Sequence, residues 1–156
     1  MYKRILYLPI LMSILTQGMS VSNLPVKNQD VSPKQLQKQN KQVAQLAAEA
    51  ESKNLPQFVD KYTKIISIKA VNTTMVYTFE INTGSKSDNT VIKEDHTRMK
   101  KAITQGICKS ARRFMNAQIT KVYIYKSAIS KKELFRFNIK ESDCIEIYGL
   151  NYRSDL

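Results

Sequence analysis

Four segments in which apolar and polar residues alternate constrain the fold most, because they come in two closely spaced pairs. Residues 66–70 lead through a turn-like Asn-Thr-Thr at 72–74 into a second alternating segment at 75–82. Residues 119–126 and 134–140 form the other pair, joined by a short polar link. Alternation with a period of two is typical of strands with one buried face, and a short link between two such strands predicts a hairpin. The sequence therefore predicts two β-hairpins.

A helical pattern precedes each hairpin. Ser32 is a candidate N-cap, Pro33 suits the first helical position, and Gln35 stands where a capping-box partner reaches back. A helix is therefore predicted to begin here, and a second helix is predicted over about 90–107. The apolar stripe of the first helix should consist of Leu36, Val43, Leu46, Ala47 and Ala50.

The order helix, hairpin, helix, hairpin indicates an α+β fold. We expect a four-stranded antiparallel sheet made of the two hairpins, with helices on one face and an N-terminal helix as an extension. After removal of residues 1–20 the chain has the size of one domain. The predicted division is a signal peptide at 1–20, a flexible leader at 21–31, the helix at 32–54, the α+β domain at 55–144, and a tail or edge strand at 145–156.

The first twenty residues have the features of an export signal. Lys3 and Arg4 precede an apolar run from Ile5 to Leu15, and small residues around Ser20 suit signal peptidase. The run is shorter than the roughly 20 residues that span a bilayer. No cysteine lies near the cleavage site, so a lipid anchor is not predicted. We expect a mature protein that is secreted or periplasmic.

Export decides how the two cysteines are interpreted. Cys108 and Cys144 are the only cysteines, and an even pair in an oxidising compartment predicts an intramolecular disulfide. The alternative is a nucleophilic thiol, which would need a base nearby. The only histidine is His96, and nothing in the sequence places it beside Cys108.

The positive charge of the chain is unevenly distributed. The formal net charge is +12, and cleavage of the signal would leave +10. Residues 93–140 contain thirteen basic and three acidic residues, so the whole surplus of the mature chain falls in this segment. A one-sided field attracts anionic partners. The alternative is that the lysines only keep a small exported domain soluble.

Two candidate surfaces for an anionic partner follow. Basic residues on and after the second helix suit lipid headgroups, because lysines near a membrane attract anionic lipids and arginines bind phosphates bidentately. These are Lys93, Arg98, Lys100, Lys101, Lys109, Arg112 and Arg113. An alternative surface for nucleic acid would combine stacking and phosphate contacts on a sheet face. It consists of Lys121, Tyr123, Tyr125 and Arg136.

No pattern of residues points to catalysis. The chain lacks the zinc-protease, serine-hydrolase, phosphate-loop and Cys-x-x-Cys motifs. Asp95 and His96 are adjacent, but neighbours on a helix do not face each other. We therefore predict a protein that is not an enzyme and that has no metal site or cofactor.

Several motifs resemble those of a known class of exported domains. They are Leu-Pro-Gln-Phe-Val-Asp at 55–60, Tyr-Thr-Phe at 77–79, the helix that carries Cys108, and Ser-Asp-Cys at 142–144. Together they resemble the α/β pilotins of type II secretion, which implies a periplasmic assembly factor. Such pilotins are lipoproteins, a feature not predicted here. In general character the chain also resembles the genus-restricted substrates that intracellular bacteria release through type II secretion.

The function predicted from the sequence is that of a secreted binding protein or effector that engages an anionic partner. Phosphorylated lipid headgroups, including phosphoinositides, are preferred over nucleic acid. The alternative is a pilotin-like periplasmic factor that binds a partner protein through its sheet edge or its N-terminal helix.

Overall fold

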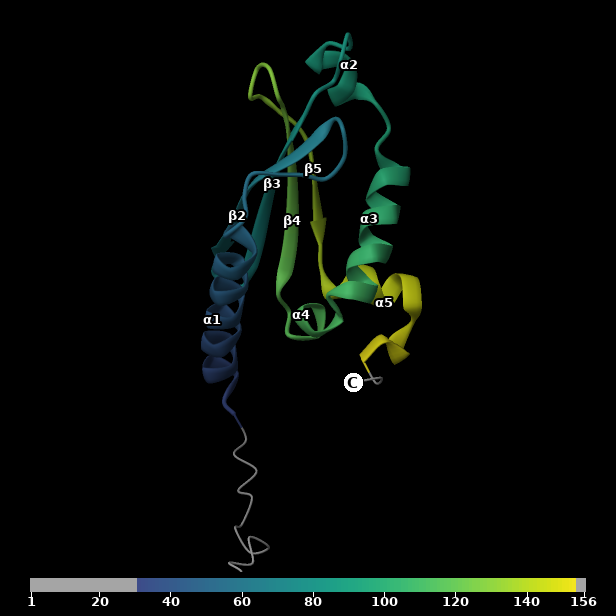
Figure 1. The fold of residues 1–156 in the computed structure, drawn as a ribbon. Helices are drawn as coiled ribbons and strands as arrows, with labels where there is room; N and C mark the ends of the chain where they lie inside the picture. The colour runs from purple at the N-terminus through teal and green to yellow at the C-terminus, as the bar shows by residue number, and fades with distance from the viewer. Residues whose placement is uncertain (1–30, 154–156) are drawn as a thin grey trace, which may run out of the picture. The chain divides into compact units, whose positions relative to one another are not determined.

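The computed structural model describes residues 31–153, and the predicted signal peptide and leader up to residue 30 lie outside this range. Figure 1 shows one sheet with its helices. Among the described residues, no helix is both long and apolar enough to cross a membrane. The elements in chain order are α1 (Pro33–Ser52), β1 (Gln57–Phe58), β2 (Thr63–Val71), β3 (Thr74–Ile81), α2 (Asp88–Lys93), α3 (Thr97–Ser110), α4 (Arg112–Asn116), β4 (Thr120–Ser127), β5 (Glu133–Ile139), α5 (Glu141–Tyr148) and a 3-10 helix (Leu150–Arg153).

The sheet has five strands in the order β1-β2-β3-β4-β5. The two predicted hairpins are present as β2–β3 and β4–β5, so the α+β class is confirmed. The prediction of four antiparallel strands is wrong on two points. The short strand β1 adds to the edge of β2, and β3 pairs with β4 in parallel. The pairing is parallel because α2, α3 and α4 carry the chain from the end of β3 back to the end of the sheet where β3 began.

Aromatic residues fill one face of the sheet. In the register of the central strands Tyr77 lies beside Tyr123, and Phe79 lies beside Tyr125. The ring centroids of these pairs are 4.9 and 4.8 Å apart. Stacked pairs of this kind add about 0.5–1.5 kcal/mol each beyond the area that they bury. The core is completed by residues of α1, α3 and α4, among them Ala44, Cys108 and Met115.

The N-terminal helix begins as predicted, but it buries a different face. The Ser32 hydroxyl accepts a hydrogen bond from the Gln35 backbone N–H at 3.3 Å, and Pro33 stands at the first helical position. The buried residues are Ala44 and Ala48, whose small side chains let α1 lie close to the sheet. The predicted stripe is wrong, because its largest members point outward. Leu36, Val43 and Leu46 are 50%, 46% and 66% exposed.

The predicted helix over 90–107 is divided into two. The Ser87 hydroxyl caps α2 by accepting from the Thr90 backbone N–H at 3.2 Å. Asp95 then accepts from the Thr97 backbone N–H at 2.9 Å and from the Thr97 hydroxyl at 2.6 Å. This short local turn satisfies the first backbone N–H of α3 and separates the helix from α2.

The described residues after β5 are mostly helical, where the sequence suggested a tail or an edge strand, and residues 154–156 of that segment lie outside the described range. α5 begins directly after β5 and ends at Gly149, whose φ of 78° lies in the left-handed region that glycine adopts without strain. The Gly149 backbone N–H donates to the Ile145 carbonyl at 2.8 Å and closes the helix.

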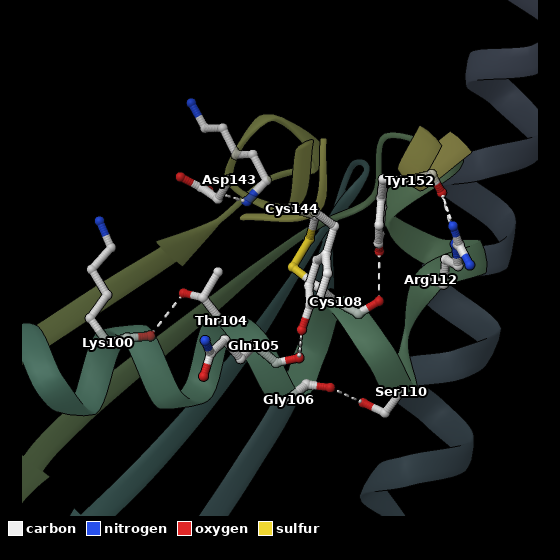
Figure 2. Close-up of a disulfide and its surroundings, with 12 residues drawn as sticks. Lys100, Thr104, Gln105, Gly106, Cys108, Ser110, Arg112, Asp143, Cys144 and Tyr152 are labelled. Carbon is white, nitrogen blue, oxygen red and sulfur yellow. Dashed lines mark hydrogen bonds between the residues drawn. A yellow bond between two sulfur atoms is a disulfide. The ribbon is translucent and has the colours of Figure 1, made fainter. Parts of the chain in front are cut away.

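The predicted disulfide is confirmed. Cys108 of α3 and Cys144 of α5 are bonded, with their Cα atoms 5.4 Å apart, and both are almost fully buried. Figure 2 shows the bond between the two helices. The disulfide fixes the C-terminal helices against α3.

Candidate functional site: an apolar groove at one end of the sheet

A groove of about 570 Å³ lies at the end of the sheet where β3 and β4 finish. One wall is the turn between β1 and β2, and the other is formed by α2 and the start of α3, while Ile81 and Phe135 come from the strands. The fourteen lining residues are Asp60, Tyr62, Thr63, Ile81, Asn82, Thr83, Gly84, Ser85, Lys86, Val91, Glu94, His96, Met99 and Phe135.

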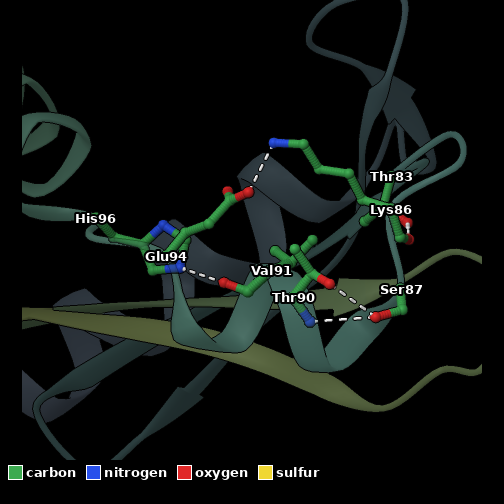
Figure 3. Close-up of polar contacts among 7 residues, drawn as sticks. All are labelled: Thr83, Lys86, Ser87, Thr90, Val91, Glu94 and His96. Carbon is green, nitrogen blue, oxygen red and sulfur yellow. Dashed lines mark hydrogen bonds and ion pairs between the residues drawn. The ribbon is translucent and has the colours of Figure 1, made fainter.

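The apolar part of the groove continues the aromatic core. The Phe135 ring stacks on the Tyr125 ring at 4.7 Å and on the His96 ring at 3.9 Å, measured between ring centroids. His96 Nε2 lies 3.0 Å from the Val91 carbonyl oxygen, so the end of α2 holds the ring in place (Figure 3). These contacts give the groove a preformed aromatic lining.

The opposite wall is a rigid turn that exposes apolar side chains. Asp60 Oδ1 accepts backbone N–H groups of Tyr62 at 2.7 Å and Thr63 at 2.8 Å. These hydrogen bonds hold the pKa of the Asp60 carboxyl below its usual range. Around this turn Phe58, Val59 and Tyr62 are 72%, 61% and 55% exposed. Exposed apolar groups gathered at one place mark interaction sites more often than isolated ones do.

The rim of the groove is polar and internally paired. Lys86 Nζ lies 2.6 Å from Glu94 Oε1, across the start and end of α2 (Figure 3). Among the lining residues, the Thr83 hydroxyl also donates to the Lys86 carbonyl at 3.0 Å. A paired rim around an apolar lining is the usual organisation of a binding interface.

The sheet face predicted for nucleic acid is not available for stacking. Lys121, Tyr123 and Tyr125 are only 6%, 8% and 4% exposed, because they lie beneath the helices. Arg136 has the opposite parity on its strand and binds Glu133 on the other side of the sheet, with a nitrogen–oxygen distance of 2.6 Å. The structure therefore does not bring these four residues together. The alternation in residues 121–125 correctly predicted that Lys121, Tyr123 and Tyr125 share one face of the sheet. It did not show that helices cover this face.

Lys121 instead belongs to a polar chain that runs from the buried sheet face to the exposed Glu51. Its Nζ donates to the Tyr77 hydroxyl at 2.7 Å, and that hydroxyl donates to Glu51 Oε2 on α1 at 2.9 Å. The ammonium also lies 5.1 Å from the centre of the Phe114 ring. Burial lowers the pKa of Lys121 and raises that of Tyr77, while Glu51 opposes the first shift and adds to the second. This chain attaches α1 to the sheet.

The seven residues predicted for anionic lipid lie on α2, α3 and α4. Lys93 ends α2, Arg98 lies in the first turn of α3, and Arg113 lies on α4. Lys100 and Lys101 line a groove of about 510 Å³ between α3 and α5, together with the carboxylates of Asp143 and Glu146. These acidic neighbours reduce the local positive field that the sequence suggested.

The remaining two of the seven predicted residues are Arg112 and Lys109, and Arg112 has a structural role. Arg112 Nε donates to the Tyr152 carbonyl at 2.8 Å, and its guanidinium lies 4.8 Å from the centre of the Tyr152 ring (Figure 2). The Tyr152 hydroxyl donates to the Cys108 carbonyl at 2.8 Å. Arg112 thus holds the C-terminal 3-10 helix. Lys109 is exposed in the last turn of α3.

Within residues 31–153, no group of three or more His, Cys, Asp or Glu side chains has an arrangement that could hold a metal ion. The groove holds two carboxylates and one imidazole, with Glu94 paired to Lys86 and Asp60 bound to backbone N–H groups. The arrangement suits binding of an apolar segment better than proton transfer or metal ligation.

Comparison with known proteins gives information about the fold. No family model and no curated protein matches the sequence. Three solved structures are similar, with low sequence identity. A protein described as secreted from Pseudomonas aeruginosa has a TM-score of 0.62 at 7% identity, covering 70% of this chain and 96% of its own.

The other two structures are pilotins of the type II secretion system. EpsS from Vibrio vulnificus has a TM-score of 0.60 at 14% identity, covering 71% of this chain and 96% of its own. AspS from Vibrio cholerae has a TM-score of 0.56 at 16% identity, covering 71% and 97%. This chain shares its fold with them. The pilotin-like resemblance of the sequence is therefore supported at the level of the fold.

The groove itself was not predicted from the sequence. Its parts lie at residues 60–63, 81–99 and 135, and only the topology brings them together. One signal was present in the segment 55–60, where Phe58 and Val59 interrupt a polar stretch between the first helix and the first hairpin.

Proposed function

We propose that the chain is an exported, non-enzymatic assembly factor that binds an apolar segment of a partner protein in the groove. The observation that carries this proposal is the preformed apolar groove flanked by exposed aromatic side chains, in a fold shared with type II secretion pilotins. The partner that this similarity suggests is a component of a type II secretion apparatus. The place of action would be the periplasm or the cell exterior.

The extent of the apolar surface favours a protein over a small molecule. A groove of about 570 Å³ has the size of a ligand pocket. However, Phe58 and Val59 flank the groove without lining it, and both are more than half exposed. A small ligand would leave these side chains in water, whereas a polypeptide segment would cover them and the groove together. Burial of such anchors supplies most of the affinity in protein interfaces.

Copurification with a pair of matched variants tests the proposal. Met99 is 36% exposed in the groove, and Leu46 is 66% exposed on α1, the other surface suggested for a partner. Met99→Glu should abolish recovery of the partner by the tagged protein from its own host, because a carboxylate would be buried against an apolar segment. Leu46→Glu should leave recovery unchanged. If Leu46→Glu abolishes recovery and Met99→Glu does not, the partner binds α1 and the groove assignment is wrong.

A further inference from the structure

Within residues 31–153, both ends of the sheet carry more basic than acidic side chains, and they differ in degree. The groove half contains Asp60, Glu80, Asp88, Glu94, Asp95 and Glu133 beside its lysines. Several of these carboxylates are paired: Glu80 lies 3.2 Å from Lys64 and 2.7 Å from Lys131. Acidic groups therefore balance much of the positive charge at this end.

Within residues 31–153, fewer acidic groups oppose the basic ones at the opposite end of the sheet. Here α4, the last turn of α3 and the first turns of α1 lie together at the lower end of the view in Figure 1. Two described carboxylates near this end are engaged: Glu141 pairs with Arg153, and Asp143 accepts from the Lys140 backbone N–H at 2.7 Å. Four exposed basic side chains at this end make no ion pair within residues 31–153. They are Lys34, Lys109, Arg113 and Lys140, named here the basic end.

Apolar side chains are exposed beside these charges. Leu36 is 50% exposed and lines a groove of about 480 Å³ with Lys34, Ala117 and other residues of the same end. Leu150 is 83% exposed at the start of the 3-10 helix that Arg112 holds against α3. Leucines set among lysines and arginines are the composition of surfaces that lie in the headgroup region of a bilayer.

We propose that the basic end is a peripheral binding surface for anionic lipid bilayers. Lysines and arginines would attract the headgroups, and Leu36 and Leu150 would enter the interface. Nucleic acid is the less suitable polyanion, because single-strand binding uses exposed aromatic platforms and the tyrosines of the sheet are buried. The surface is separate from the groove, so failure of the partner-binding proposal would leave this one untouched.

Vesicle co-sedimentation at physiological ionic strength tests the proposal. The probes are vesicles of phosphatidylcholine alone and of phosphatidylcholine mixed with phosphatidylglycerol. Because each basic residue near an anionic membrane contributes about fivefold in binding, the triple variant Lys34→Glu, Lys109→Glu, Arg113→Glu should bind the mixed vesicles at least ~100-fold more weakly. The matched control is the triple variant Lys93→Glu, Arg98→Glu, Lys132→Glu, which changes the net charge equally. It should bind the mixed vesicles less than ~10-fold more weakly than the unchanged protein.

A second pair of changes separates lipid binding from general attraction to polyanions. Leu36→Gln with Leu150→Gln should weaken vesicle binding by about tenfold and leave binding to heparin unchanged. Equal losses in the two triple variants would show that the net charge of the whole chain acts and would overturn the proposal. Tighter binding to single-stranded RNA than to mixed vesicles would also overturn it.

Discussion

Removal of the disulfide should weaken the fold by a calculable amount without abolishing it. Cys108 and Cys144 are separated by 36 positions, so the bond closes a loop of moderate length. Without the bond the unfolded chain gains conformational entropy. On the loop-entropy estimate this lowers the free energy of unfolding by about 4 kcal/mol. The double variant Cys108→Ala, Cys144→Ala should therefore have a free energy of unfolding lower by about that amount.

The fold should nevertheless persist in this variant, because other contacts hold the C-terminal helices. The Tyr152 hydroxyl donates to the Cys108 backbone carbonyl at 2.8 Å, and this bond does not depend on the sulfur atoms. Arg112 Nε also keeps its bond to the Tyr152 carbonyl. Near-ultraviolet circular dichroism should therefore show native packing below the transition.

Denaturant unfolding at neutral pH measures the difference, with the melting temperature as a second readout expected to fall by roughly 15 °C. Ser110→Ala is a matched control, since it is an exposed change in the same helix that removes one hydrogen bond, to the Gly106 carbonyl at 2.9 Å. The control should change stability by less than about 1 kcal/mol. A loss below about 1 kcal/mol in the double variant would refute the reasoning, and so would complete unfolding.

Three further changes test the buried polar groups. Lys121→Met should cost about 1–2 kcal/mol in denaturant unfolding, because it removes the hydrogen bond that the ammonium donates to the buried Tyr77 hydroxyl; unchanged or higher stability would contradict this. Burial raises the pKa of Tyr125 to about 12 and that of Tyr77 further, so their contribution to stability is complete below pH ~10 and is lost as pH rises through the folded-state pKa. Ultraviolet titration should show these phenols ionising together with unfolding, and ionisation in the intact fold near pH 10 would be the opposite result. Arg112→Gln should cost about 1–2 kcal/mol and speed amide exchange in the Tyr152 helix, and unchanged exchange there would mean that the contact is not structural.

Local patterns in the sequence predicted the hairpins and the start of α1 because their causes are local. Alternation of apolar residues places β2–β3 and β4–β5, and Ser32 with Pro33 places the helix start. The parallel pairing of β3 with β4 depends on the path of the 38 residues between them, which no short pattern records. The same limit applies to β1, whose two residues carry no periodicity.

The predicted sites also divide into features that local sequence determines and features that depend on distant parts of the chain. The disulfide followed from export and an even pair of cysteines, whereas burial of Tyr123 and Tyr125 followed from helices far away in the sequence. Charge counted along the chain pointed to residues 93–140. In space the basic end combines residues of this segment with Lys34 of the first helix, which lies far outside it in the sequence.

Site-specific photo-crosslinking in the native host tests the central claim most directly. A photoreactive amino acid would replace Tyr62 in the groove wall, and in a second strain Lys69, which is exposed on β2 outside the groove. We expect an adduct between the Tyr62 probe and one protein of the secretion apparatus. This adduct should be lost when Met99→Glu is added, and the Lys69 probe should form no such adduct. The same adduct from both probes, or none with a secretion component from Tyr62, would contradict the assignment of the groove as the binding site.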